Sequence, residues 1–372
     1  MLLSAALITR DEERFLDGCL KSIGAVVDEI VVVDTGSRDA TVAIAARHGA
    51  RVLSRPWGGD FAAARNHALG QCQGRWLLYI DADERLVLDG DLRAELGAAG
   101  DDVVAATVAF RPTLHSTRYL EHRLLRNRPD LRFAGAIHET LMPDLDRIVR
   151  DERATVARMP ASIDHLGYEG DQTAKHRRDL PLLTLEAEHD PDRTYLWFQL
   201  GLVEAGLGHP EQAERHWATG VAAARSRGAL TTPDLPLFAE LVLLRLNQAA
   251  ATGSPAGAPV GDLVDELVRT HPDDPLTAWV QANLAMAERR WSDAVSFLEA
   301  LVGHRASQAT HPVLAYDQRI FGPLANHALG VCWLHLGDPA RAVTHLRRAL
   351  ADDPGNGEYR VKLDLAQARL RT

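Results

Sequence analysis

Apolar and polar positions alternate along the first hundred residues in a way that predicts strands and helices in turn. The segments 3–9 and 29–34 are short runs rich in Leu, Ile and Val, as expected for strands that are buried on both faces. A run at 51–54 and a longer one at 74–84 predict two further strands. Such alternation is typical of a parallel β-sheet that is covered by helices on both faces.

Helices are predicted between these strands. Apolar residues recur at helical spacing over 16–23 and again over 60–72. A further helix is predicted over 37–48, with Ser37 or Asp39 as its N-cap. These helices would cover the two faces of the predicted sheet.

Polar side chains stand at the ends of three predicted strands. Thr9 ends the first strand, Asp34 ends the second, and Asp81 follows the apolar part of the fourth. In open α/β sheets, ligands bind beyond the carboxyl ends of the strands. The three residues therefore define the first candidate site.

From about residue 171 the pattern changes to helices rich in Ala and Leu. One helix–turn–helix junction recurs three times, as LGHPEQA (207–213), ERRWSDA (288–294) and LGDPARA (336–342). The last copy, counted from Pro323, fits the tetratricopeptide pattern of about 34 residues. A helical pair at 234–270, interrupted by a loop at 253–259, is predicted between the first two copies.

These patterns predict two domains. Residues 1–170 form an α/β domain, and residues 171–372 form a linker helix followed by tetratricopeptide-like repeats. Stacked helix pairs make a concave surface that commonly holds an extended peptide. We therefore expect the repeats to present a peptide or protein acceptor to the first domain, or else to mediate self-association into a homodimer.

Composition narrows the class of protein. The 372 residues are 46% hydrophobic and 25% charged, as in ordinary globular proteins. The formal net charge of −10 excludes a general nucleic-acid binder, which needs a basic surface to neutralise phosphates. The apolar runs are short, and none approaches the roughly 18 uninterrupted apolar residues of a membrane span. The three cysteines lie far apart without CxxC spacing, so we expect free thiols and a cytoplasmic protein.

Asp81-Ala82-Asp83 carries the clearest chemical signal. Two carboxylates separated by one residue at a strand end match the ligands of a hard divalent cation such as Mg²⁺ or Mn²⁺. A cation there would bridge the diphosphate of a nucleotide and neutralise the charge that grows as the diphosphate departs. The alternative is that these residues only shape the turn after the strand.

A series of motifs extends along the chain. They are TRDEE (9–13), VVVDTGSRDAT (31–41), WGGDFAAARNHAL (57–69), YIDADE (79–84), RLLR (123–126), FAGAIHE (133–139), IDHLGYEGD (163–171) and KHRRDLPLL (175–183). This series resembles family 2 glycosyltransferases of GT-A fold, in the subgroup fused to tetratricopeptide repeats, which includes the sublancin-type glycocin S-glycosyltransferases. The resemblance implies a hexosyltransferase that moves a sugar from a UDP-sugar with inversion. No QxxRW motif follows, which disfavours a processive membrane-bound synthase.

The resemblance also assigns residues to the nucleotide sugar. Thr9 and Glu13 would lie near the nucleoside, and Asp34 would bind uracil. Arg65 and Asn66, on the helix that follows Trp57, would face the donor diphosphate or sugar.

On the metal side, the resemblance has Asp81 approach the ribose or the metal, and Asp83 bind the metal directly. His165 is a candidate third ligand, because imidazole suits Mn²⁺ as carboxylate does. The alternative is a structural histidine, with Asp164 as the competing base or ligand.

On the acceptor side, Glu139 is the predicted general base and His138 its neighbour in the AIHE motif. The alternative is a surface glutamate beside a histidine packed in the core. Arg123, Arg126 and Arg128 are predicted either to contact phosphate or to form one solvated face.

The predicted function is therefore an inverting, metal-dependent transfer from a UDP-sugar to a peptide or protein, through sulfur or oxygen. One alternative is a protein-binding scaffold with an inactive transferase fold. Another is a transferase for a small molecule or a cell-envelope glycan. A nucleotidyltransferase would need a basic or Gly-rich triphosphate loop, whereas TRDEERF (9–15) contains no glycine.

Overall fold

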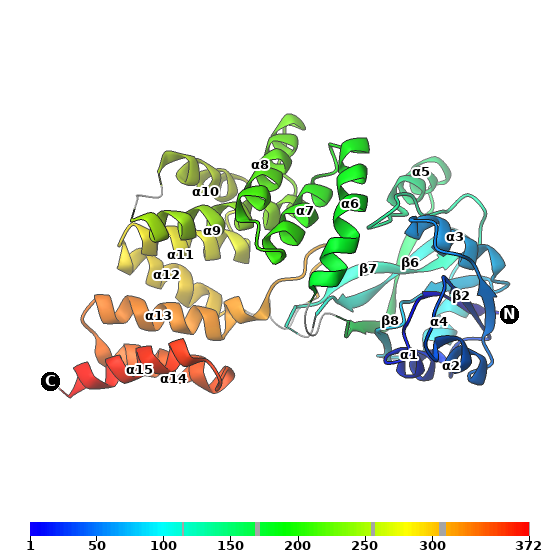
Figure 1. Cartoon of the computed structure of the whole chain (residues 1–372), viewed down its shortest axis with the longest axis horizontal. Helices are drawn as coiled ribbons and strands as arrows, with labels where there is room; N and C mark the ends of the chain where they lie inside the picture. Colours follow the sequence, from blue (N-terminus) through cyan, green and yellow to red (C-terminus); the bar gives the residue numbers. More distant parts are fainter. Residues whose placement is uncertain (114, 168–171, 254–256, 305–309, 372) are drawn as a thin grey trace. The chain divides into compact units, whose positions relative to one another are not determined.

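The computed structural model describes residues 1–113, 115–167, 172–253, 257–304 and 310–371. These residues form two compact units. The sheet unit comprises Met1–Leu114, Arg118–Glu186 and Thr310–Ala315, and the helical unit comprises His115–Thr117, Ala187–Ala309 and Tyr316–Thr372 (Figure 1). The predicted domain boundary after residue 170 stays a prediction.

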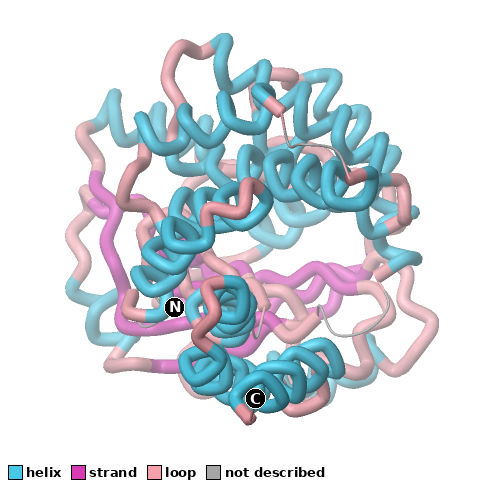
Figure 2. The backbone as a smooth tube through the Cα atoms, turned by 90° about the vertical axis from the view of Figure 1, so that its left-hand side faces the viewer, coloured by secondary structure: helices cyan, strands magenta, loops and turns pink. Residues whose placement is uncertain are grey.

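The strands described in the sheet unit, drawn in magenta in Figure 2, form one sheet. Their order in it is β3-β2-β1-β4-β7-β6-β8-β5. They are β1 Leu3–Thr9, β2 Glu29–Asp34, β3 Arg51–Ser54, β4 Trp76–Tyr79, β5 Glu84–Leu88, β6 Val103–Arg111, β7 Tyr119–Arg126 and β8 Thr155–His165. Strands β1 to β4 pair in parallel, as predicted. Because β7 runs antiparallel to β4 and β6, and β5 antiparallel to β8, the whole sheet is mixed. The sequence pattern did not predict this second half.

Helices cover both faces of the sheet, as predicted. The helices of this part of the chain are α1 Leu16–Ile23, α2 Thr41–Arg47, α3 Phe61–Gln71, α4 Leu92–Ala98, α5 Met142–Glu152 and α6 Thr173–His189. In β1, Leu3 and Leu7 face a core that includes side chains of α1, α2 and α4. Ala6 faces the opposite core, which includes side chains of α3 and α5. The strand is therefore buried on both sides, which explains its continuous apolar run.

The prediction that a capped helix begins at Ser37 is wrong. Helix α2 begins at Thr41, and its N-cap is Ala40, whose side chain cannot accept a hydrogen bond. Asp39 instead accepts from the backbone N–H of Thr41 (2.9 Å). The Ser37 hydroxyl accepts from the N–H of Asp11 (2.9 Å), so the polar residues that suggested a cap hold the loop after β1.

The helical unit consists of paired helices in its described residues. They are α7 Thr194–Gly206, α8 Pro210–Ser226, α9 Leu235–Thr252, α10 Ala258–Thr270, α11 Pro275–Ala287, α12 Trp291–Val302, α13 Pro323–His335, α14 Pro339–Asp352 and α15 Gly357–Leu370. The three predicted junctions fall between α7 and α8, α11 and α12, and α13 and α14. The predicted pair at 234–270 is α9 and α10. Its interrupting loop includes 254–256, which lie outside the described residues.

Glycines allow the paired helices to pack closely. A Cβ atom added to Gly201 would lie 1.9 Å from Trp217 Nε1, and one added to Gly330 would lie 2.4 Å from Leu346 Cγ. Both contacts join the first helix of a pair to the second. The small residue in the predicted repeat pattern is therefore a packing requirement.

We expect Gly201→Ala to lower the free energy of unfolding of the helical unit by about 1–3 kcal/mol, because the added methyl group overlaps the Trp217 ring. Denaturant unfolding monitored by circular dichroism measures the change. Gly261→Ala is the matched control, since Gly261 lies inside α10 and has no atom within 4 Å of the added Cβ. The control should be neutral or stabilising, by at most about 1 kcal/mol. Equal losses in both variants would contradict the packing explanation.

All three cysteines are free, as predicted, and each is buried. Exposure is 0% for Cys19, 7% for Cys72 and 0% for Cys332. Burial raises the pKa of each thiol. Across the described residues, no helix combines the length and the apolar composition that crossing a bilayer requires.

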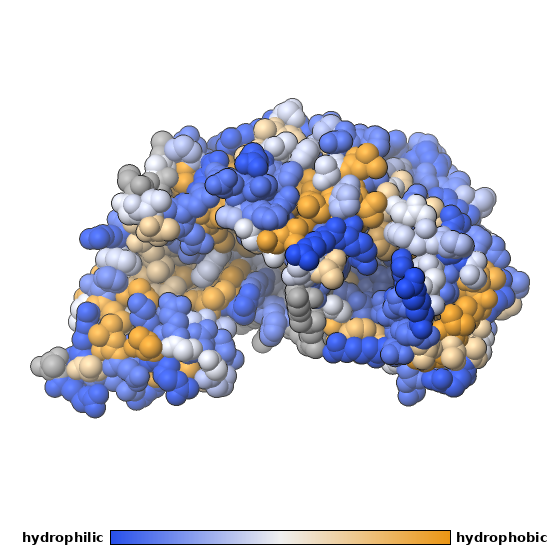
Figure 3. All heavy atoms as spheres, in the orientation of Figure 1, coloured by the Kyte–Doolittle hydropathy of each residue, from blue (hydrophilic) through white to orange (hydrophobic). Residues whose placement is uncertain are grey.

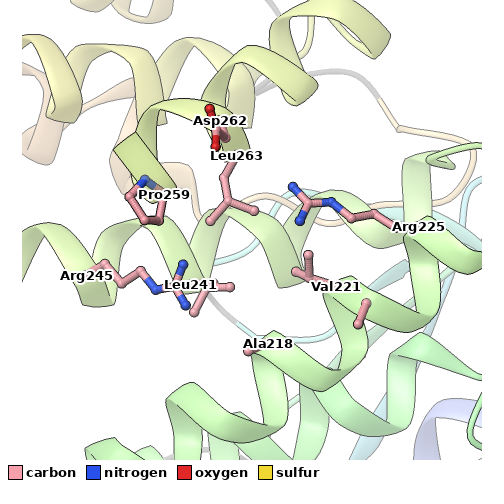
Figure 4. Close-up of a pocket in the computed structure, with 9 residues that line it drawn as sticks. Ala218, Val221, Arg225, Leu241, Arg245, Pro259, Asp262 and Leu263 are labelled. Atoms are coloured by element: carbon pink, nitrogen blue, oxygen red, sulfur yellow. The ribbon is translucent and has the colours of Figure 1, made fainter. Parts of the chain in front are cut away.

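Two surface features of the helical unit stand out. A pocket of about 400 Å³ opens between α8, α9 and α10, with Arg225 and Arg245 at its sides (Figure 4). Both guanidinium groups already pair with glutamates, at 2.7 and 2.9 Å, so the pocket carries little uncompensated charge. Apolar side chains also gather over the C-terminal helices (Figure 3). On α15, Val361 is 67% exposed and Leu365, one turn further on, is 42% exposed.

Candidate active site

The carboxyl ends of β1 and β2 bring Thr9 and Asp34 side by side, because the two residues pair in the sheet register. The Asp34 carboxylate accepts hydrogen bonds from the backbone N–H groups of Gly36 and Ser37, each at 3.1 Å. Thr9 Oγ1 is buried and has no hydrogen-bond partner within the described ranges. Both residues lie at the predicted ligand edge of the sheet. Their contacts with a nucleoside remain predictions.

Arg65, on α3, joins two of the predicted site residues. Its Nε donates to Glu139 Oε1 (2.7 Å), and its Nη2 donates to Asp81 Oδ1 (3.1 Å). Only 7% of the Arg65 side chain is exposed, and the guanidinium lies 5.0 Å from the ring centre of Tyr79 and 5.5 Å from that of Phe133. The turn after β4 and the segment that carries Glu139 therefore meet at one buried cation.

The charges around Asp81 keep it ionised. Burial raises the pKa of Asp81, but the guanidinium groups of Arg65 and Arg123 outweigh burial and hold that pKa below its ordinary value. The Asp81 side chain is 37% exposed. It therefore combines a fixed negative charge with access from solvent.

Glu139 belongs to a closed loop between β7 and α5. Backbone hydrogen bonds join Ala134 and Thr140 in both directions, at 2.8 and 2.9 Å. His138 has a φ of 49°, in the left-handed region that is unfavourable for a side chain other than glycine. The Glu139 side chain is only 11% exposed, so the alternative of a surface glutamate is wrong. The roles of Glu139 as base and of His138 beside it remain predictions.

Asn66 is engaged by the same segment. Its Oδ1 accepts from the N–H of Phe133 (2.9 Å), and its Nδ2 donates to the carbonyl of Phe133 (2.8 Å). The Asn66 amide thus makes the two backbone hydrogen bonds that a paired strand would make, and it holds the segment before Glu139 against α3. A contact between Asn66 and the donor remains a prediction.

Asp83 and His165 form a pair. His165 Nε2 lies 3.0 Å from Asp83 Oδ2, and its Nδ1 lies 2.9 Å from the carbonyl oxygen of Pro112, to which it must donate. Burial lowers the pKa of His165, but the hydrogen bond and charge of Asp83 raise it above its ordinary value. A Cβ on Gly167 would lie 1.8 Å from Asp83 Oδ2, so glycine leaves the space that this carboxylate occupies.

This pair has the chemistry of a cation site. Carboxylate oxygen and imidazole nitrogen suit Mn²⁺, and carboxylate suits Mg²⁺. In the part of the chain that the structure describes, no three His, Cys, Asp or Glu side chains are gathered to hold a metal ion. Asp83 and His165 would therefore need Asp81 or the phosphates of a nucleotide to complete the coordination.

The sequence did not identify Glu12 as a site residue. Burial raises the pKa of Glu12 to about 7, and the negative charges of Asp83 and Asp81 add to the rise. Glu12 therefore lies within electrostatic range of Asp81 and Asp83, whereas Glu13 Oε2 accepts from the N–H of Ala40 (3.0 Å) before α2. The TRDEE motif offers two adjacent glutamates, and only the local backbone decides which of them turns inward. A nucleoside contact for Glu13 remains a prediction.

The arginines of β7 and its loop are neither a phosphate cluster nor a solvated face. Arg123 is buried and pairs with Glu84 (2.8 Å). Arg126 donates to backbone carbonyls, including that of Val103 (2.8 Å). Arg128 pairs with Asp130 (2.7 Å). All three guanidinium groups therefore bind carboxylates or carbonyl oxygens of the sheet unit.

The parallel half-sheet, the helices on both faces and the acidic turn after β4 define an α/β domain of the GT-A class. Residues 4–147 match the model of Glycosyl transferase family 2. This match covers the N-terminal part of the chain, and tetratricopeptide-like helix pairs follow it, as the resemblance implied.

Three curated proteins are similar to parts of the chain. A TPR repeat-containing protein of Synechococcus elongatus is 37% identical over 257 residues, which cover 66% of this chain and 62% of the relative. The lipopolysaccharide core biosynthesis glycosyltransferase LpsC of Rhizobium meliloti is 36% identical over 160 residues, which cover 38% of this chain and 57% of LpsC. The prophage-derived glycosyltransferase SunS of Bacillus subtilis is 24% identical over 148 residues, which cover 38% of this chain and 35% of SunS. The chain thus spans less than two thirds of each relative.

Proposed function

We propose that this protein is an inverting glycosyltransferase that moves a hexose from a UDP-sugar to a side chain of a peptide or protein. The observation that carries the proposal is the Asp81–Arg65–Glu139 cluster, with distances of 3.1 and 2.7 Å on the two sides of the guanidinium. In this proposal Asp81 would serve the donor and Glu139 the acceptor, and both carboxylates bind the same buried guanidinium. The family of the N-terminal domain supports the reaction type.

On the donor side, Thr9 and Asp34 would hold the nucleoside, and Asp83 and His165 would hold a Mg²⁺ or Mn²⁺ ion, with Asp81 nearby. A divalent cation bound there supplies charge neutralisation for the departing diphosphate. Arg65 Nη1 is buried without a partner in the described residues. An oxygen of the donor phosphate or sugar would satisfy this nitrogen, which otherwise costs desolvation free energy.

On the acceptor side, Glu139 would take the proton of the attacking hydroxyl or thiol. The acceptor atom forms a bond to the anomeric carbon as the bond from that carbon to the diphosphate oxygen breaks, and UDP leaves. Arg65 holds Glu139 at Oε1, which orients the carboxylate. The nucleophile approaches opposite the diphosphate, so the configuration at the anomeric carbon inverts.

A panel of nucleotide sugars, followed by mass spectrometry of hydrolysis and transfer products, tests the proposal. We expect UDP-sugars to be turned over only with Mg²⁺ or Mn²⁺ present. A calorimetric titration with UDP and Mn²⁺ separates the alternative of an inactive scaffold, which would give no metal-dependent heat. Absence of both binding and turnover would refute the proposed reaction.

We further propose that the repeats present the peptide acceptor, as their helix pairs suggest. The double variant Gly201→Ala/Gly330→Ala, which loosens two of these pairs, should reduce transfer to peptide at least about tenfold while donor hydrolysis persists. Deleting the region would be a poorer test, because Thr310–Ala315 belong to the sheet unit. Unchanged peptide transfer by a variant with measurably loosened repeats would contradict this role. A homodimer through the repeats remains the alternative.

A glycan acceptor is the second candidate, and the similarity to LpsC favours it. Lipopolysaccharide core oligosaccharides and peptides offered as competing acceptors distinguish the two. Exclusive labelling of the glycan would replace the peptide proposal and leave the donor chemistry intact.

A further inference from the structure

A buried ion pair lies beneath the acidic turn. Glu84, the first residue of β5, is 1% exposed in its side chain, and Arg123 of β7 is 5% exposed. Arg123 Nη1 donates to Glu84 Oε2 (3.0 Å) and Nη2 to Oε1 (2.8 Å). The guanidinium lies between two rings, 4.8 Å from the centre of Tyr79 and 4.6 Å from that of Phe110. Two hydrogen bonds and two aromatic rings therefore hold the Arg123 guanidinium in place against Glu84.

Glu84 also bonds to both backbone groups of Asp81. Its Oε2 accepts from the N–H of Asp81 (2.8 Å), and its own N–H donates to the carbonyl of Asp81 (3.0 Å). Three strands separate β4 from β5 in the sheet order, so the two strands that flank the turn do not pair with each other. The N–H of Leu166 donates to the carbonyl of Asp83 (2.9 Å) at the end of the turn, and the Glu84 carboxylate holds its beginning at Asp81.

Stability alone does not account for this arrangement. A buried ion pair gains little over apolar side chains of similar volume, because both charges lose their hydration. An apolar residue at position 84, however, could not accept the hydrogen bond from Asp81. The Glu84 carboxylate is therefore required to orient the backbone of Asp81, and the Arg123 guanidinium is required to keep that carboxylate in place.

We propose that Glu84 and Arg123 are positioning residues that set the orientation of the Asp81–Asp83 turn toward the donor and its cation. This inference rests on the proposed function, since it concerns the same site. Arg65 holds the side chain of Asp81, and Arg123, through Glu84, holds its backbone. Neither Glu84 nor Arg123 contacts substrate in this mechanism.

Glu84→Gln keeps the shape of the side chain but removes the charge that Arg123 balances. Two measurements on the full chain follow its effect: amide hydrogen exchange of the segment 79–84, and calorimetric affinity for UDP with Mn²⁺. The matched control is Asp234→Asn, which alters another ion pair with a buried carboxylate, Arg227–Asp234, in the helical unit. Circular dichroism checks that each variant is folded.

We expect Glu84→Gln to accelerate exchange of 79–84 and to weaken UDP binding about 10- to 100-fold in the presence of Mn²⁺, as loss of residues that orient metal ligands does. Asp234→Asn should change neither quantity. Glu84→Gln binding within twofold of the wild type, with unchanged exchange, would overturn the proposal.

Amide hydrogen exchange of the wild-type protein alone provides a second test of the positioning role. The Asp81 amide should be strongly protected from exchange, and fast exchange there would overturn the inference even if no variant folds. If the wild type binds no UDP with Mn²⁺, the proposed function fails instead, and the exchange of 79–84 in wild type and Glu84→Gln still decides the positioning role.

Discussion

Asp83→Ala is expected to reduce sugar transfer by about 10²- to 10³-fold or more, the size of effect seen when one group that stabilises developing charge is removed. The variant loses a carboxylate ligand for the cation, namely the one that lies 3.0 Å from His165 Nε2. Initial rates at saturating UDP-sugar, measured across a Mn²⁺ titration, test this. The loss should persist at high Mn²⁺, since the departing diphosphate is then poorly neutralised.

Asp151→Ala is the matched control, because Asp151 is an exposed residue near the end of α5. It should leave the rate and the metal dependence unchanged. Wild-type turnover by Asp83→Ala would show that the cation, if required, is bound elsewhere, and the assignment of the acidic turn would be wrong.

Glu139→Gln should lower kcat by about 10²- to 10⁴-fold for a hydroxyl acceptor, the usual contribution of a general base. Affinity for UDP should change little, because the amide oxygen of Gln can still accept from Arg65 Nε. Single-turnover rates with bound donor measure the chemical step directly. Glu95→Gln, at an exposed position on α4, is the control and should behave as wild type.

The size of this effect also depends on the acceptor atom. A thiol needs less help from a base than a hydroxyl, because a few per cent is already ionised near neutral pH. A small loss with a cysteine peptide, together with a large loss with a serine peptide, would therefore fit the same mechanism. A small loss with both acceptors would remove Glu139 from the role of base.

Local patterns predicted the first half of the sheet unit well. The bounds of β1, β2 and α1 coincide with the predicted segments, because each is a short element whose apolar period is set by burial. The convergence of strand ends followed from the parallel order. The second half was not predicted, since β7 pairs with β4, and β8 pairs with β5 and β6, across long stretches of sequence, and a strand pattern alone does not specify its partner.

Side-chain roles were harder to predict than elements. Arg123 shares its strand with Arg126, and only the fold reveals that it points inward to Glu84. Asn66 follows Arg65 directly, yet helical geometry turns the two side chains in different directions, one to carboxylates and the other to the backbone of Phe133. Neighbours in a motif therefore need not share a function.

The burial of all three cysteines bears on how modification would be detected. Each thiol is shielded and has a raised pKa, so none is a nucleophile while the protein is folded. The enzyme cannot then compete with a cysteine peptide for sugar in the same tube. An increase in the intact mass of the enzyme itself would report attachment through oxygen or nitrogen, or a partly unfolded preparation.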